Sequence, residues 1–153
     1  MVIRAYIFSG GLLIPEDFKE VLSVNEMFYK ALESGNLGLM EEVWVKDPRA
    51  KCVHPGWPIL LGWEAIRQSW KNIFDSGGPT KIQISNVTVE ISGDLAWITC
   101  IEHISHVIRD QVQINMAHAT NIFERHGSHW LMIHHHASPM PMPRGKVADD
   151  KLQ

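Results

Sequence analysis

The spacing of apolar residues in this chain changes once, near Lys81, and this change constrains the fold more than any other feature. Before Lys81, apolar residues recur every three or four positions, as on one face of a helix. After it, they alternate every second position, as in strands with one buried face. Helices followed by antiparallel strands indicate the α+β class. With 153 residues, 45% of them hydrophobic, the chain forms one domain with a substantial core and is too short for two.

Turn and cap residues divide the two halves into elements. Pro15 lies where a helix begins and Gly35 where one ends. We expect helices over residues 16–34 and 37–44, a short strand over residues 50–54, and a third helix from Trp63 to the Gly-Gly-Pro sequence at residues 77–79. Strands are expected from Lys81 to the turn at residues 93–94, and over residues 95–108, 112–124 and 129–138. The alternation changes phase between Ile84 and Val87, which predicts a β-bulge near Ser85 and Asn86.

The domain is expected over residues 15–138, with an N-terminal arm or added strand over residues 1–14 and a C-terminal tail over residues 139–153. Residues 1–14 begin like a secretion signal, but two glycines at positions 10 and 11 interrupt the apolar run. No small-residue cleavage site follows, which favours an arm over a signal.

Composition argues against two kinds of partner. Lys and Arg total 14 against 17 Asp and Glu, a net charge of -3, and the basic residues are scattered, so we expect no nucleic acid partner. No run approaches the ~20 apolar residues of a membrane-spanning helix, so we expect no membrane partner either. Cys52 and Cys100 are too few for a disulfide framework, which favours reduced, buried thiols in a cytoplasmic protein.

The strand over residues 112–124 has two unlike faces. One carries the short or polar side chains of Ala117, Ala119 and Asn121, which would leave a cavity beneath the helices. The other face is apolar and predicts a homodimer through the outer side of the sheet. This outer face consists of Val112, Ile114, Met116, His118, Thr120 and Ile122. The opposite phase, in which the alanines only make room for another strand, remains open.

Glu102 shares its strand face with the apolar residues Ile98 and Ile104. If it is buried there, its pKa should rise, which would make it an acid or base at neutral pH. A structural ion pair with Arg109 is the alternative, and the sequence leaves both open.

The nine histidines do not form a metal-site pattern. On a strand, His134 and His136 point the same way, about 6.6 Å apart, and His135 points the other way, so the three cannot act as one cluster. No Cys-x-x-Cys or His-Glu-x-x-His spacing is present, nor a Gly-rich phosphate loop or a nucleophile elbow. We therefore expect no metal and no cofactor.

Four ordered segments resemble the SnoaL-like branch of the nuclear-transport-factor-like superfamily. They are FYKALESGNL at residues 28–37, CVHPGW at 52–57, GWEAI at 62–66, and Trp130 followed by IHHHAS at 133–138. The resemblance spans about residues 16–138. It implies a cystatin-like, cone-shaped α+β barrel with about three N-terminal helices on a strongly curved, mainly antiparallel sheet, a cavity between the layers, and frequent homodimers. The superfamily includes ketosteroid isomerases, polyketide cyclases and kinase association domains, so the fold does not settle the activity.

The resemblance to ketosteroid isomerases carries over only in part. Their catalytic base falls on His54 and their protonated aspartate near Asn121. Their tyrosine falls on Phe28, which has no donor, while Tyr29 is expected to face elsewhere.

We expect a small apolar ligand pocket in which His54 is the general base, Glu102 or His136 orients it, and Asn121 holds a carbonyl oxygen. The expected ligand contacts are Phe28, Trp57, Trp63, Ala117, Ala119 and Asn121. The chemistry would be cofactor-free proton transfer of the isomerase, cyclase, dehydratase or hydrolase type on a small carbonyl or polyketide-like compound. The alternative is a non-catalytic ligand-binding or dimerisation module, and the sequence leaves open whether catalysis occurs.

Overall fold

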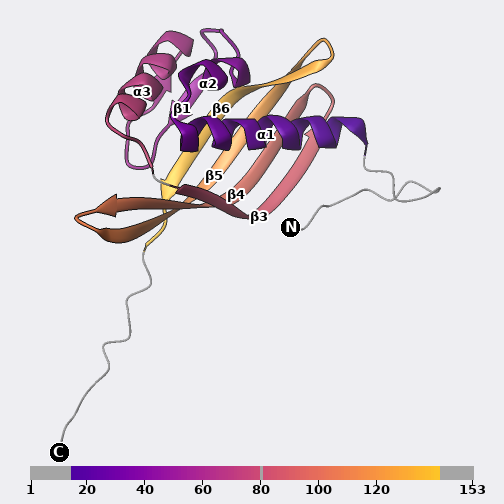
Figure 1. The fold of residues 1–153 in the computed structure, drawn as a ribbon. Coiled ribbons are helices and arrows are strands. Elements are labelled where there is room, and N and C mark those ends of the chain that lie inside the picture. The colour runs from indigo at the N-terminus through magenta and orange to yellow at the C-terminus, as the bar shows by residue number, and fades with distance from the viewer. Residues whose placement is uncertain (1–14, 80, 142–153) are drawn as a thin grey trace, which may run out of the picture.

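Three helices lie on one side of a curved sheet in the computed structural model, which describes residues 15–79 and 81–141 (Figure 1). The predicted arm over residues 1–14 and the predicted tail beyond residue 141 lie outside the described residues. The helices are α1 (Glu16–Ser34), α2 (Leu37–Val43) and α3 (Trp63–Asp75). Their bounds agree closely with the prediction. Gly35 ends α1 in the left-handed conformation, with φ of 64°, and the Asn36 side chain accepts a hydrogen bond from the Leu39 amide at the start of α2.

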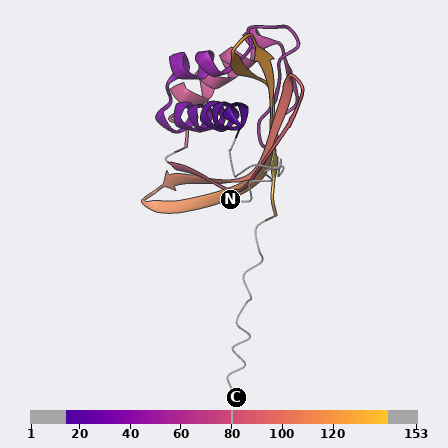
Figure 2. The ribbon, with the colours of Figure 1, turned by 90° about the vertical axis from the view of Figure 1, so that its right-hand side faces the viewer.

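The sheet has six strands in the order β2-β1-β6-β5-β4-β3. They are β1 (Lys51–Val53), β2 (Leu60–Leu61), β3 (Lys81–Ser92), β4 (Leu95–Ile108), β5 (Gln111–His126) and β6 (His129–Pro139). All neighbours are antiparallel except β1 and β6, which run parallel. The sheet is therefore mixed, and it stays open instead of closing into a barrel. Figure 2 shows that it bends beneath the helices, which all lie on its concave side.

The predicted bulge in β3 is confirmed. The pairing of β3 with β4 shifts between Ser85 and Thr88, and Asn86 has a φ of 52°. The extra residue keeps Ile82 and Val89 on the same buried face despite their odd separation.

The core fills the space between the helices and the concave face of the sheet. Its largest fully buried side chains include Trp44, Trp70, Trp130, Phe28 and Phe123. None of the helices in the described part of the chain is both long enough and apolar enough to cross a membrane.

Candidate functional site

A cavity of about 400 Å³ lies between the helix layer and the concave face of the sheet. Its walls come from the C-terminal part of α1, the loop after β1, α3, and the inner faces of β3 to β6. Most lining side chains are apolar or aromatic, and none of the described lining residues is Lys or Arg. The volume lies within the range of small-molecule sites, roughly 300–1,000 Å³. The polar groups among the lining residues are His54, Glu102, His106, Asn115 and His135.

The inner face of β5 has the predicted phase. Ala117 and Ala119 are 1% and 2% exposed and face the helices, whereas Val112 and Ile114 on the other face are 67% and 48% exposed. Ala117 lines the cavity, but Ala119 lies deeper in the core and does not. The open space is therefore at the Asn115–Ala117 end of the strand.

Glu102 is a buried carboxyl on the inner face of β4, only 2% exposed, and it lines the cavity. The Tyr29 hydroxyl donates a hydrogen bond of 2.8 Å to its Oε1. Burial raises the pKa of Glu102 to about 7, and the Tyr29 hydrogen bond opposes that rise only in part. No ion pair with Arg109 forms among the described residues. Glu102 is therefore placed to exchange a proton near neutral pH.

Tyr29 joins Glu102 to a buried polar network. The Asn121 amide nitrogen donates to the Tyr29 hydroxyl at 3.1 Å and to Asn25 Oδ1 at 2.8 Å. The prediction that Tyr29 faces elsewhere is wrong, because this part of α1 is buried on two adjacent sides and both Phe28 and Tyr29 point into the core. Asn121 is fully buried and does not line the cavity, so both of its N–H groups serve the protein and neither reaches a ligand carbonyl.

His54 lies at the end of β1, is buried, and lines the cavity. Its Nε2 is 2.9 Å from Ser69 Oγ, and its ring packs edge-on against Trp57 and Trp70. Burial lowers the pKa of His54 to about 4, so the imidazole is neutral at pH 7 and weakly basic. No hydrogen bond joins His54 to Glu102 among the described residues.

The placement of His136 in the pocket is wrong; His135 lies there instead. The pairing of β5 with β6 shifts at Ile122 and Phe123, which leaves Ile133 as an extra residue on β6. This bulge puts His135 on the buried face and His136 on the exposed outer face. Nδ1 of His135 is 2.6 Å from Asn121 Oδ1, and burial holds the pKa of His135 well below its ordinary value.

Of the remaining predicted ligand contacts, one lines the cavity and two do not. Trp57 lines the cavity and is partly exposed. Phe28 and Trp63 do not line it, because both are core residues that pack against Trp44. Four residues in or beside the site were not predicted from the sequence: Tyr29, Ser69, Trp70 and His135. The cross-strand pairing of His135 with Asn121 would have found His135, had the bulge at Ile133 been recognised.

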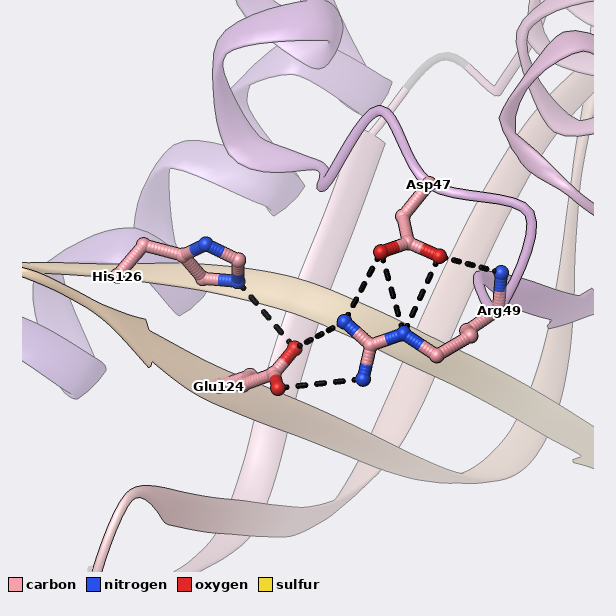
Figure 3. Close-up of polar contacts among 4 residues, drawn as sticks. All are labelled: Asp47, Arg49, Glu124 and His126. Carbon is pink, nitrogen blue, oxygen red and sulfur yellow. Dashed lines mark hydrogen bonds and ion pairs between the residues drawn. The ribbon is translucent and has the colours of Figure 1, made fainter.

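A second polar cluster lies on the surface, in contrast to the buried network around Tyr29 (Figure 3). The Arg49 guanidinium donates to both oxygens of Glu124 at 3.1 and 3.2 Å and to Asp47 at 2.9 Å. His126 adds a contact of 3.2 Å to Glu124. This cluster fastens the loop before β1 to β5. Separately, the described residues contain no group of three or more His, Cys, Asp or Glu side chains able to hold a metal ion.

Three helices on the concave side of an open, mixed sheet, with a cavity between the layers, define the NTF2-like class with the cystatin-like fold of several solved structures. The chain belongs to the SnoaL-like domain family, whose model matches residues 21–143.

Relatives with known structures support this assignment. A candidate dehydratase of the NTF2-like family from Streptomyces avermitilis is 29% identical, with a TM-score of 0.74 over 81% of this chain and 96% of that one. A candidate calcium/calmodulin-dependent protein kinase type II association domain from Thiobacillus denitrificans is 28% identical, with a TM-score of 0.71 over 78% and 94%.

One curated relative, the F-box protein SKIP8 of Arabidopsis thaliana, is 29% identical over 122 residues. The match covers 80% of this chain but only 50% of that protein. The chain thus spans about half the length of this relative.

Proposed function

We propose that the cavity binds a small, mostly apolar molecule and that Glu102 transfers a proton on it without a cofactor. The reaction would be an isomerisation, cyclisation, dehydration or hydration of a small carbonyl or polyketide-like compound. One observation carries the proposal: a carboxyl group with a pKa of about 7 lines an apolar cavity of about 400 Å³. At neutral pH such a group is present in both its acid and its base form, which suits proton transfer in either direction.

The surroundings of Glu102 favour it over His54 as the proton-transfer group. Tyr29 holds Oε1, and Oε2 makes no hydrogen bond to any described residue, so it is available to a ligand. Because burial lowers the pKa of His54 to about 4, its imidazole accepts a proton less readily than the Glu102 carboxylate does. We therefore assign His54 to ligand contact and Glu102 to proton transfer. The relative described as a candidate dehydratase supports the same class of chemistry.

The test measures proton exchange directly, so it needs no natural substrate. The protein is incubated in D₂O with a panel of small cyclic ketones that also carry a hydroxyl group, and loss of the α-proton signal is followed by NMR. Glu102→Gln keeps the side-chain volume and should slow exchange roughly 100-fold or more. His136→Gln, on the outer face of β6, is the matched control and should leave the rate unchanged. Full exchange activity in Glu102→Gln would contradict the assignment.

We also propose that the chain forms a homodimer through the outer face of the sheet. That face presents Trp97, Val112 and Ile114 to solvent, each more than one third exposed. Exposed apolar groups of this size on one sheet face favour self-association. The relative described as a kinase association domain supports the idea. A dimer without catalysis would correspond to the alternative, a ligand-binding or dimerisation module.

Light scattering after size exclusion distinguishes these states. The wild-type chain should have twice the monomer mass, and Trp97→Lys combined with Ile114→Lys should yield a monomer. Lys30→Glu, a charge change on the exposed side of α1, is the control and should remain dimeric. A wild-type monomer at high concentration would rule the dimer out.

A cytoplasmic location is part of the same proposal. It is supported by Cys52 and Cys100, which are both free and buried. Burial raises the pKa of the Cys100 thiol to about 11, so this thiol is unreactive and fits a structural role in a reducing compartment.

A further inference from the structure

The hydrogen positions in the cavity wall follow from counting donors, beginning with His54. The Ser69 hydroxyl is 2.7 Å from the Ile66 carbonyl oxygen, and two oxygens at that distance need a hydrogen between them. Ser69 has one hydroxyl hydrogen, so its oxygen accepts at the 2.9 Å contact with His54 Nε2. Nε2 of His54 therefore carries the proton and Nδ1 carries a lone pair. Among the described residues its hydrogen-bond contact is Cys52 Sγ at 3.9 Å, and a thiol is a weak donor at best.

Counting donors in the same way shows which ring nitrogen of His135 carries the proton. The Tyr29 hydroxyl has one hydrogen, which it donates to Glu102, so its oxygen accepts from Asn121. The amide nitrogen of Asn121 thus faces Tyr29 and its carbonyl oxygen faces His135. At 2.6 Å from that oxygen, Nδ1 of His135 must carry the proton. Nε2 of His135 is left with a lone pair and makes no hydrogen bond to any described residue.

The buried polar residues of the lining therefore offer mainly acceptors, whereas the N–H donors of Trp57, His106 and Asn115 belong to lining residues that are partly or fully exposed to solvent. His54, His135 and Glu102 all line the cavity, and lone pairs remain on His54 Nδ1, on His135 Nε2 and, in its ionised form, on the Glu102 carboxylate. The indole N–H of Trp70 has no partner, but its nitrogen is covered by protein atoms and is closed to a ligand. With no Lys or Arg among the described lining residues, an anionic ligand would find no countercharge.

We propose that the natural ligand is an uncharged, flat, mostly apolar molecule that brings its own hydrogen-bond donors, hydroxyl or N–H groups, to His54, His135 and Glu102. This inference rests on the proposed function in assuming that the cavity is a ligand site, and it adds the chemical class. Trp57 and Trp70, which pack around His54, supply the flat apolar surface. A ligand that offers only carbonyl acceptors would leave at least two of these lone pairs unpaired.

Isothermal titration calorimetry with four naphthalene probes tests the assignment. They are 2-naphthol, which donates; 2-methoxynaphthalene, which only accepts; naphthalene, which does neither; and 2-naphthoate, which is charged. We expect 2-naphthol to bind about tenfold more tightly than 2-methoxynaphthalene, and 2-naphthoate to bind most weakly. His135→Phe should reduce the preference for 2-naphthol, whereas His136→Phe on the outer face should not.

The outcomes separate the two proposals. If the uncharged probes bind equally, or if 2-methoxynaphthalene or 2-naphthoate binds most tightly, the donor assignment is overturned while the cavity stands as a ligand site. If no probe binds, naphthalene included, the proposed function fails together with the ligand class. The wild-type ratio decides the question even if His135→Phe does not fold, which circular dichroism would reveal.

Discussion

Two polar clusters of this protein place a carboxyl group in opposite environments, one at the surface and one in the core. In the surface cluster, hydrogen bonds from Arg49 hold the pKa of Asp47 and of Glu124 below their usual range (Figure 3). In the buried cluster, Glu102 has no cationic partner among the residues that the structure describes, and burial raises its pKa to about 7. A partnered, solvated carboxylate stays charged and fastens the loop before β1 to β5. A buried carboxyl that is hydrogen-bonded only to a neutral donor has a raised pKa and can exchange its proton near neutral pH.

The largest expected effect comes from breaking the buried cluster at its centre. Asn121→Leu removes the partners of His135, Tyr29 and Asn25 together. Since each unsatisfied buried group costs about 1–3 kcal/mol, the free energy of unfolding should fall by about 3 kcal/mol or more. Chemical denaturation measures it. Asn115→Leu, an exposed residue on the same strand face, is the control and should change stability by less than about 0.5 kcal/mol. Equal losses in both variants would mean that the network has no special role.

The second prediction concerns how the stability contributed by the buried cluster depends on pH. The folded pKa of Glu102, about 7, exceeds its ordinary value of 4.5, so the unfolded chain releases this proton first as pH rises. The stability contributed by this group is therefore fully present below about pH 4.5 and lost as pH rises through 7. The loss is on the order of 3 kcal/mol. Comparing wild type with Glu102→Gln in denaturation at pH 5 and pH 8 isolates it: the wild type should lose stability relative to the variant. A constant difference would contradict the raised pKa.

The surface cluster should respond in the opposite direction and more weakly. Because the pKa values of Asp47 and Glu124 are lowered, their contribution to stability is present above the ordinary carboxyl range and lost as pH falls through their folded values. Arg49→Ala should lower the thermal midpoint only slightly, and high salt should remove most of the difference, because exposed ion pairs are screened. A loss as large as that of Asn121→Leu would erase the distinction between the clusters.

Local patterns predicted most of the fold. The residue-by-residue alternation gave β4 its bounds and located the bulge in β3, because both depend on neighbours in sequence. The parallel pairing of β1 with β6 was not predictable in this way, since it joins residues about 80 positions apart, such as Cys52 and His135. Whether the sheet closes into a barrel or stays open also depends on pairing between strands far apart in sequence, so it was not predictable in this way either.

The candidate site was predictable in part, for the same reason. Glu102 and Ala117 reach the cavity because regular strand alternation fixes their direction, and His54 was located through the resemblance to ketosteroid isomerases. His136 was misplaced because the bulge at Ile133 reverses the phase of β6 beyond it, and no change of residue type marks that position. Tyr29 was missed because helix periodicity gives the buried side of α1 but not how far a hydroxyl extends across the core to β4.

Carbon-13 NMR titration of the glutamate side-chain carboxyls tests the central claim most directly, because Glu102 and Glu124 can be followed in one sample. The resonance of Glu102, assigned through Glu102→Gln, should show a midpoint near pH 7, while that of Glu124 should titrate below the ordinary glutamate range. A midpoint for Glu102 near 4.5 would show that the cavity hydrates this carboxyl as bulk water does, and the proton-transfer assignment would be lost.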